Sequence, residues 1–338
     1  MRQAFTVLMV LLLCSAFAFA GGQGEAPAEE TYSWRIGFNT VEGSVRDVSA
    51  REFKRVVEER SNGRIQVQIF PAEQLGSEQE MIESVMIGAL DIQLCGGSAL
   101  QNLFPDVLPP SLPFMLTSYD EAHALLDGPY GEHIRAKGRE HNLMMLSYLD
   151  LGFVQITSNR RPIRQPSDLE GLQVRSPNEP VFIEAFRGLG ARVSTLPFTE
   201  VYLALSQGVV DAQFNPLDAI YDTKFYEVQD YLAITNQWYY YVVFMMNHTL
   251  WDSLPSDIRA IVQEGANAAR DTSREWFRTK DAEMLELLRP HFREITEPDT
   301  ALFQEKLQPV YRNVYSRMVP PEALAIAQDF LDEYRASR

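Results

Sequence analysis

The chain has 338 residues, of which 46% are hydrophobic and 22% are charged, an ordinary composition for a soluble globular protein with room for two hydrophobic cores. Its 30 basic and 46 acidic residues give a formal net charge of −16. This charge argues against nucleic acid and anionic membrane surfaces as partners, and it means that an anionic ligand would need a local positive site.

The first 20 residues are expected to direct export and not to belong to the fold. Arg2 precedes an apolar run that ends in Ala18-Phe19-Ala20, a small-residue cleavage pattern. We therefore predict a signal peptide at residues 1–20, with a lipoprotein signal at Cys14 as the alternative. Residues 21–31 are too polar and too rich in Pro and Gly to fold, so they are predicted to be a disordered tether. No later segment has the ~20 apolar residues of a membrane span.

The first part of the folded chain alternates strands and helices. Apolar periodicity predicts a strand at 34–38, a helix at about 44–60, a strand at 64–70, a helix at about 77–88 and a strand at 90–95. Such a βαβαβ run makes its strands parallel. Cys95, the only cysteine left after signal cleavage, is expected to be a small buried hydrophobe that forms no disulfide.

A Pro-rich passage follows, then a predicted helix at about 120–137 and a strand at about 143–150. Gly152, just beyond this strand, is a candidate hinge residue.

Residues 171–215 repeat the βαβαβ pattern. Strands are predicted at 172–175, 192–196 and 209–214, with Asn178 as the N-cap of one helix and Thr199 starting the next. A short internal repeat supports two related halves, because Gly88-Ala-Leu-Asp-Ile-Gln-Leu matches Gly208-Val-Val-Asp-Ala-Gln-Phe. Ligands of open α/β sheets bind outside the carboxyl ends of parallel strands, where Arg175, Phe198 and Asn215 fall.

The last part of the chain is predicted to tie the two halves together. A strand is expected at 239–246. A helix from Pro255 to about Leu288 would be ~45–50 Å long, enough to lie across two domains. Two further helices are expected at 301–317 and 322–334.

None of the catalytic, metal-binding or cofactor-binding motifs that we considered occurs in the sequence. Gly188-Leu-Gly190 ends a helix and does not open one, and His133 and His141 have no third ligand nearby. Arg175, at a strand end, can hold a carboxylate through two parallel hydrogen bonds, but a structural salt bridge explains it equally well. Asn215 offers a donor and an acceptor, and a turn role before Pro216 is an equal alternative.

Three segments carry a resemblance that changes this balance: Gly171-Leu-Gln-Val-Arg175-Ser-Pro, Phe198-Thr-Glu-Val-Tyr-Leu-Ala-Leu-Ser-Gln-Gly-Val-Val-Asp211-Ala-Gln-Phe-Asn215-Pro, and Lys224-Phe-Tyr-Glu-Val-Gln229. They resemble the solute-binding proteins of tripartite ATP-independent periplasmic (TRAP) transporters, from about Trp34 to Glu264. The resemblance implies an α/β fold of the two-domain periplasmic binding protein (Venus-flytrap) type. Each domain would be a βαβαβ-based sheet flanked by helices, with a long helix bracing both. We predict domain I at 32–151 plus 241–280, and domain II at 152–240 plus 281–338.

The resemblance also implies a binding site. The residue at the Arg175 position binds the substrate carboxylate in that family, the residue at the Asn215 position contacts the same ligand, and those at Asn39 and Phe198 line the cleft. Many members carry an arginine at Val154 and a glutamate at Phe214, so these two positions are also expected to line the binding site. These two departures predict a smaller or more apolar monocarboxylate, with the aromatic run beginning at Trp238 supplying stacking walls.

The function implied is that of a periplasmic binding protein, a monomer without cofactor or metal, that performs no chemistry. It would close over an organic acid and deliver it to the TRAP permease subunits in the membrane. One alternative is an exported carbohydrate-active enzyme, which needs two carboxylates facing one cleft. Another is a ligand-sensing partner of a signalling receptor.

Overall fold

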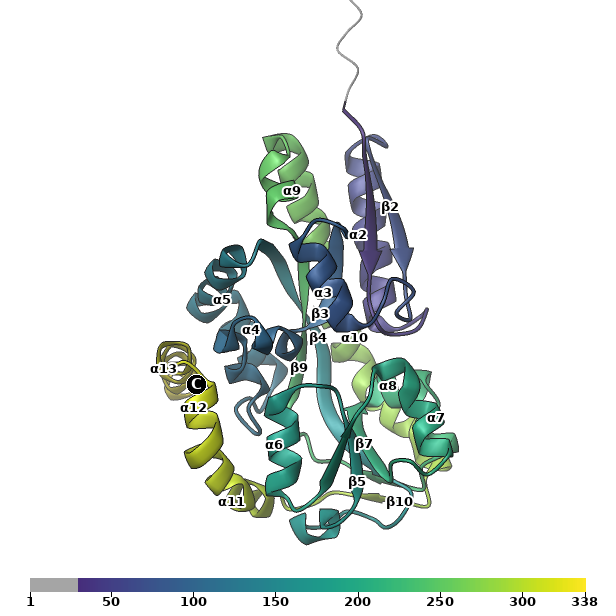
Figure 1. Cartoon of the computed structure of the whole chain (residues 1–338). Coiled ribbons are helices and arrows are strands. Elements are labelled where there is room, and N and C mark those ends of the chain that lie inside the picture. The colour runs from purple at the N-terminus through teal and green to yellow at the C-terminus, as the bar shows by residue number, and fades with distance from the viewer. Residues whose placement is uncertain (1–29) are drawn as a thin grey trace, which may run out of the picture.

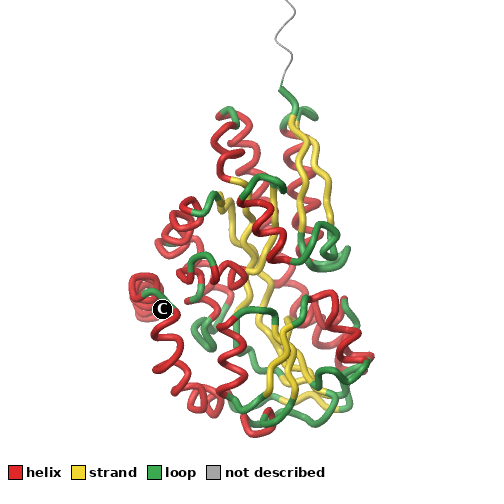
Figure 2. Tube along the Cα trace, in the orientation of Figure 1, coloured by secondary structure: helices red, strands yellow, loops and turns green. Residues whose placement is uncertain are grey.

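The computed structural model describes residues 30–338 (Figure 1). The predicted signal peptide, the alternative lipidation site at Cys14 and most of the predicted tether lie outside the described residues. Among residues 30–338, no helix combines the length and the apolar character that crossing a membrane requires. The strands form two groups that a single long strand connects, and helices surround both groups (Figure 2). We call each group of strands with its helices a lobe.

The first lobe is built on the predicted parallel strands. β1 (Tyr32–Gly37) pairs in parallel with β2 (Ile65–Phe70) and with β3 (Ile92–Gly96), and α2 (Val45–Arg60) and α3 (Glu78–Met86) are the crossover helices. Ser44 caps α2 and Ser77 forms a capping box with Glu80 at the start of α3. The first βαβαβ prediction is therefore confirmed. Cys95 is a buried free cysteine, as predicted, and burial raises the pKa of its thiol.

The second lobe repeats this arrangement. β5 (Gln173–Ser176) pairs in parallel with β6 (Arg192–Thr195) and β7 (Ala212–Pro216), with α6 (Pro180–Gly188) and α7 (Val201–Ser206) between them. The last strand begins three residues later than predicted and includes Asn215. The predicted N-cap at Asn178 is wrong by one residue, because Pro180 takes the first helical position of α6 and Glu179 precedes it.

The internal sequence repeat is also a structural repeat. In the first lobe the Asp91 carboxylate accepts a hydrogen bond from the backbone N–H of Arg35 in β1, at 2.8 Å. In the second lobe the Asp211 carboxylate accepts from the backbone N–H of Gln173 in β5, at 2.9 Å. Each aspartate thus ties the chain before the third strand to the first strand of its own sheet.

Two long elements join the lobes. β4 (Leu143–Ser158) pairs with β9 (Tyr239–Asn247) in the first lobe and with β7 in the second, so it runs further than the strand predicted at 143–150. Gly152, the candidate hinge, has a φ of +94° at a bulge in β4. α10 (Ser256–Leu288) packs Ile258 into the core of the first lobe and Leu288 into that of the second. The predicted bracing helix is therefore confirmed.

The remaining elements include two short strands that extend the second sheet and the helices around both sheets. The helix predicted at 120–137 is two helices, α4 (Tyr119–Asp127) and α5 (Pro129–Glu140), because Gly128-Pro129 breaks it. The helix predicted at 301–317 is interrupted by a π-helical turn at Tyr311–Tyr315, which follows Pro309. The other elements are α8 (Leu217–Asp222), β8 (Tyr231–Ala233), α9 (His248–Ser253), β10 (Glu294–Thr296), α11 (Thr300–Val310), α12 (Ser316–Met318) and α13 (Pro321–Ala336).

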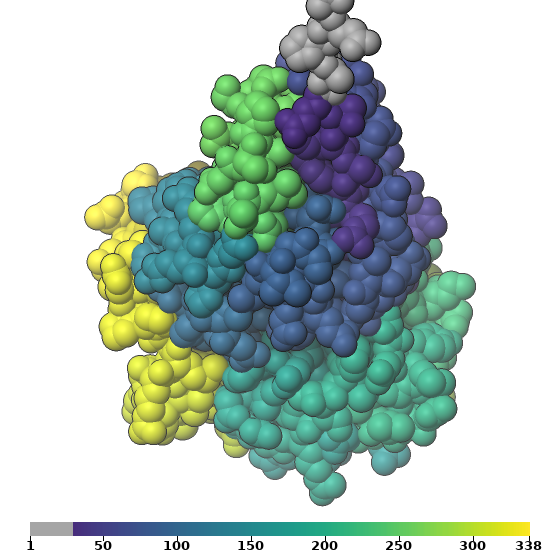
Figure 3. Space-filling model, turned by 45° about the horizontal axis from the view of Figure 1, so that its top comes forward, coloured from purple at the N-terminus to yellow at the C-terminus, as the bar shows by residue number. Residues whose placement is uncertain are grey.

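The C-terminal helices pass along one flank of both lobes (Figure 3). Phe303 and Leu307 of α11 belong to the core of the second lobe. Ala327 and Leu331 of α13 are buried instead in the core of the first lobe, against α4 and α5. The chain thus returns to the first lobe at its C-terminal end.

Candidate functional site

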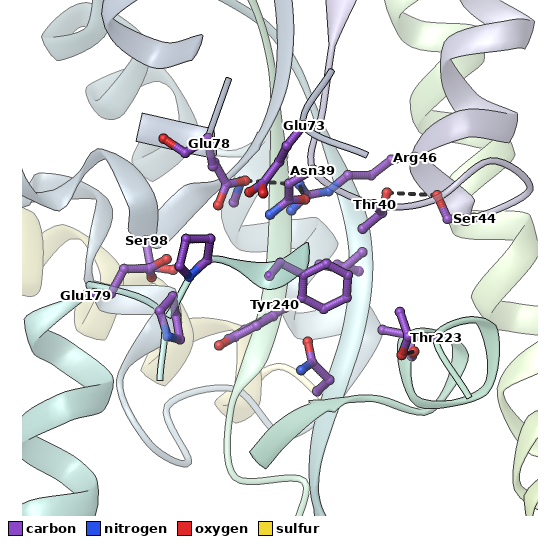
Figure 4. A pocket seen from close by; sticks show the side chains of 18 of the residues that line it. Asn39, Thr40, Ser44, Arg46, Glu73, Glu78, Ser98, Glu179, Thr223 and Tyr240 are labelled. Atoms are coloured by element: carbon purple, nitrogen blue, oxygen red, sulfur yellow. Dashed lines mark hydrogen bonds and ion pairs between the residues drawn. The ribbon is translucent and has the colours of Figure 1, made fainter. Parts of the chain in front are cut away.

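A cavity of about 390 Å³ lies between the lobes. Its walls come from the carboxyl ends of the parallel strands in both sheets, as expected for an open α/β architecture. The first lobe contributes polar side chains that include Asn39, Thr40, Arg46, Glu73, Glu78 and Ser98. The second lobe contributes Arg175, Glu179, Phe198, Asn215, Asp218 and Asp222, and Tyr240 of β9 completes the wall. Figure 4 shows part of this lining.

Arg175 lies at the end of β5 and is only 4% exposed. Its Nε and Nη2 atoms both donate to the backbone carbonyl of Leu196, at 3.1 and 2.7 Å. Nη1 makes no hydrogen bond to any residue that the structure describes. One edge of the guanidinium is therefore anchored, and the edge formed by Nη1 and Nη2 is left for a ligand. Desolvation lowers the pKa of Arg175 to about 10, so it stays cationic at neutral pH.

Asn215 is held by a chain of buried polar side chains. Its Nδ2 donates to Oε1 of Gln213 at 2.5 Å, and Nε2 of Gln213 donates to Thr157 at 2.9 Å. Thr157 in turn donates to Gln229 at 3.0 Å. Because this network fixes the amide, the Asn215 side chain presents a defined acceptor to the cavity. Phe198, the third residue expected here, also lines the cavity, on the loop that follows β6.

Asn39 lines the cavity from the loop after β1. It contacts Arg46, a cation of the cavity wall that the sequence did not predict. Nη1 of Arg46 donates to Oδ1 of Asn39 and to Oε1 of Glu78, the latter at 3.0 Å. The Arg46 side chain is 4% exposed. Figure 4 shows these three side chains together on the first-lobe side. Arg46 lies in the first turn of α2, where the helix dipole disfavours a cation, and that placement was the available signal.

Glu73 is a second residue that the sequence reasoning missed. It follows β2 in a turn where Ala72 and Glu73 have φ values of +52° and +57°. The backbone N–H groups of both residues donate to the chain after β1, at 2.8 and 3.1 Å, which holds this unusual conformation in place. Oε2 of Glu73 accepts from Oγ1 of Thr199 at 2.5 Å, a direct contact between the two lobes. Burial raises the pKa of Glu73.

Three further carboxyl groups belong to the cavity wall, the buried Glu179 and Asp218 and the half-buried Asp222. Desolvation raises the pKa of Glu179 and of Asp218 to about 8, and that of Asp222 to about 6. Each has a buried oxygen with no hydrogen-bond partner among the described residues. The cavity is therefore rich in acceptors whose partners the described chain does not supply.

Three predicted site residues are not in the cavity wall. Val154, Phe214 and Trp238 are fully buried and belong to one apolar cluster of the second lobe, where the rings of Phe214 and Trp238 lie 5.2 Å apart. Phe214 points away from the cavity because it alternates with Asn215 along β7. From the aromatic run, Tyr240 and Tyr241 reach the cavity in place of Trp238. The two departures from the family pattern thus pack against the same core.

Two lobes joined at a hinge-like crossing, with a polar cavity between them, define the class of two-domain periplasmic binding proteins. The family described as "Bacterial extracellular solute-binding protein, family 7" (DctP) matches residues 37–318. The chain belongs to this family, as the motifs around Arg175 and Asn215 predicted, and the family consists of binding proteins for transported solutes.

Individual relatives agree with this assignment. The 2,3-diketo-L-gulonate-binding periplasmic protein YiaO of Escherichia coli is 29% identical over 86% of this chain and 89% of its own. The crystal structure of the sugar acid binding protein DctPAm from Advenella mimigardefordensis, in complex with galactonate, has a TM-score of 0.86. It is 28% identical and the match covers 90% of this chain and 99% of that one. A TRAP solute-binding protein from Sulfitobacter sp. NAS-14.1, with bound β-D-galacturonate, has a TM-score of 0.84 at 26% identity, over 89% and 99% of the two chains.

Proposed function

We propose that this protein binds the carboxylate of an organic acid at Arg175 and delivers the acid to the TRAP permease subunits in the membrane. The observation that carries the proposal is the orientation of Arg175. The Leu196 carbonyl holds one edge of the guanidinium, and the free edge lies in the cavity wall, suited to two parallel hydrogen bonds with a carboxylate. Asn215, Asn39 and Phe198 complete the proposed contacts.

The polar lining favours a more polar ligand than the smaller or more apolar monocarboxylate that the sequence predicted. That expectation rested on Val154 and Phe214, which lie in the core and do not shape the cavity. The cavity instead offers hydroxyl, amide and carboxyl groups from both lobes. A monocarboxylate with several polar substituents fits these groups, and galactonate, the ligand of the similar Advenella protein, is of this kind.

Ligand binding is proposed to close the lobes around the hinge at Gly152. The domain boundaries then follow the sequence prediction, 32–151 plus 241–280 and 152–240 plus 281–338, with one change. The packing of Ala327 and Leu331 in the core of the first lobe supports our assignment of residues 321–336 to the first domain. The hydrogen bond from Thr199 to Glu73 already bridges the two lobes across the cavity, so opening would break it and closure would keep it.

The enzyme alternative requires carboxylates in one cleft, and Glu73, Glu179 and Asp218 meet that requirement. Membership of a family of binding proteins nevertheless favours capture without chemistry. We therefore propose a monomeric periplasmic binding protein with no nucleic-acid partner.

A thermal-shift screen against a library of organic acids tests the proposal. A ligand at 100 times its dissociation constant adds ~2.7 kcal/mol to the free energy of unfolding, which gives a clear rise in melting temperature. Stabilisation by uncharged analogues, such as the corresponding amides or alcohols, to the same degree as by the acids would contradict carboxylate recognition.

A further inference from the structure

The charged groups that line the cavity include more carboxylates than cations. Among the described lining residues, the cations are Arg46 and Arg175, and the carboxylates are Glu73, Glu78, Glu179, Asp218 and Asp222. Arg46 is already paired with Glu78 at 3.0 Å. In the proposed function Arg175 pairs with the ligand. Most of the cavity's carboxyl groups therefore have no ion-pair partner within residues 30–338, and a buried charge without a partner is costly.

Asp218 and Asp222 are the clearest example of cavity carboxyl groups without a partner. They lie four residues apart on α8, so their side chains project from the same face of the helix into the cavity. Asp218 is 3% exposed, and its Oδ1 has no hydrogen-bond partner among the described residues. Oδ2 of Asp222 is buried and equally without a partner there. Leaving a buried acceptor unsatisfied costs ~1–3 kcal/mol, a cost that a donor from outside the chain would remove.

The surroundings of this pair add negative potential. Desolvation raises the pKa of Asp218, and the nearby carboxylates of Asp222 and of Asp281, on α10, raise it further. The Asp281 carboxylate accepts a hydrogen bond from the hydroxyl of Tyr119 at 3.0 Å. Arg175, by contrast, is among the charges that lower the pKa of Glu73 and Glu179. The cavity wall therefore carries its unpaired positive charge at Arg175, on β5, and a separate pair of acidic side chains on α8.

The partner that fits the acidic pair on α8 is an organic cation. A metal ion does not fit, because the described residues contain no group of three or more side chains able to hold one. A hydroxyl group would satisfy single oxygen atoms but would leave Asp218, whose pKa burial raises to about 8, in its protonated form. A protonated amine lowers that pKa, so that Asp218 ionises when the amine binds, and it supplies three N–H donors to the oxygens of two carboxylates.

We propose that Asp218 and Asp222 form a second subsite that binds a protonated amine of the ligand. The ligand class is then an acid that carries an amino group at the end remote from its carboxylate. The inference rests on the proposed function, because Arg175 has to hold the carboxylate for the amine to reach α8.

Matched acids test the inference by titration calorimetry at pH 7. The probes are gluconate against 6-amino-6-deoxygluconate, and ω-hydroxy against ω-amino straight-chain acids of four to eight carbons. We expect the amino-substituted acid with the highest affinity to bind about ten- to a hundred-fold more tightly than its hydroxy counterpart. This range is typical of a hydrogen bond to a charged group. Asp218→Asn, which keeps the shape and removes the charge, should abolish this preference. Glu305→Gln, on the exposed face of α11, is the matched control and should preserve it.

The outcomes separate the two claims. If the hydroxy acids bind as tightly as the amino acids, or if the preference survives in the Asp218→Asn and Asp222→Asn double variant, the amine subsite is wrong and the carboxylate site stands. If Arg175→Ala binds the acids as the unmodified protein does, or if no acid of either series binds the unmodified protein, the proposed function is wrong and the subsite with it.

Discussion

Replacing Arg175 with alanine should remove most of the ligand affinity and leave a folded protein. Loss of the guanidinium leaves the ligand carboxylate desolvated and without its partner. Truncating one side of a buried charge pair typically costs ~2–5 kcal/mol, which is roughly a 30- to several-thousand-fold loss of affinity. Arg46 does not compensate, because Glu78 and Asn39 already engage it. Arg175→Lys should also lose much of the affinity, because an ammonium cannot reproduce two parallel hydrogen bonds.

The unliganded protein should be affected less than the complex. Arg175→Ala removes both donors to the Leu196 carbonyl, and an unsatisfied buried carbonyl costs ~1–3 kcal/mol. The same change relieves the desolvation that lowers the pKa of Arg175 to about 10, which offsets part of this cost. We therefore expect a fall in the free energy of unfolding that is smaller than the loss of binding free energy.

Titration calorimetry and melting curves without ligand measure the two quantities separately. Arg192→Ala is the matched control, because Arg192 is an exposed arginine on the adjacent strand β6. It should change neither the affinity nor the melting temperature appreciably. Near-normal affinity in a folded Arg175→Ala protein would refute the reasoning. A large drop in melting temperature with little loss of affinity would show that Arg175 is a structural residue.

Three further predictions follow from the same contacts. Because burial raises the pKa of Asp218 to about 8, the folded state holds its proton while the unfolded state loses it near pH 4, so this group destabilises the protein as pH rises through that window. Asp218→Asn should therefore raise the melting temperature more at pH 8 than at pH 5, and an equal effect at both would contradict the shift. Thr199→Val breaks the hydrogen bond to Glu73 between the lobes and should weaken ligand binding by about five-fold, as measured by calorimetry. Unchanged affinity would show that the contact does not stabilise the closed form. Mass spectrometry of the exported protein should find Gly21 at the N-terminus, and a lipidated Cys14 would overturn cleavage after Ala20.

The sequence predicted the arrangement of strands and helices and part of the site, because both depend on local and topological rules. A βαβαβ unit makes its strands parallel, and residues at their carboxyl ends must meet at one edge of a sheet. Arg175, Asn215, Asn39 and Phe198 follow from that rule together with the family resemblance. The long helix follows from an uninterrupted apolar period.

Two kinds of site residue escaped these rules. Arg46 and Asp218 lie at helix starts, and whether such residues face a cavity or solvent depends on how the lobes pack, which no local pattern encodes. Val154 and Phe214 were placed in the site incorrectly because β4 and β7 are buried on both faces. Strands of this kind lack the alternation of polar and apolar residues that identifies the functional face.

The distribution of charge between the lobes bears on the order of events in binding. The cavity-lining cation of the first lobe is Arg46. Glu78 of the same lobe neutralises it, so this side of the cavity attracts an anion weakly. The cation of the second lobe, Arg175, has only a backbone carbonyl as its described partner. An acid should therefore dock first on the second lobe, where Asn215 also lies, and closure would then bring Asn39 and Glu73 onto it. In stopped-flow measurements Arg175→Ala should slow association, whereas Asn39→Ala should mainly speed dissociation, and the opposite pattern would show that the first lobe captures the ligand.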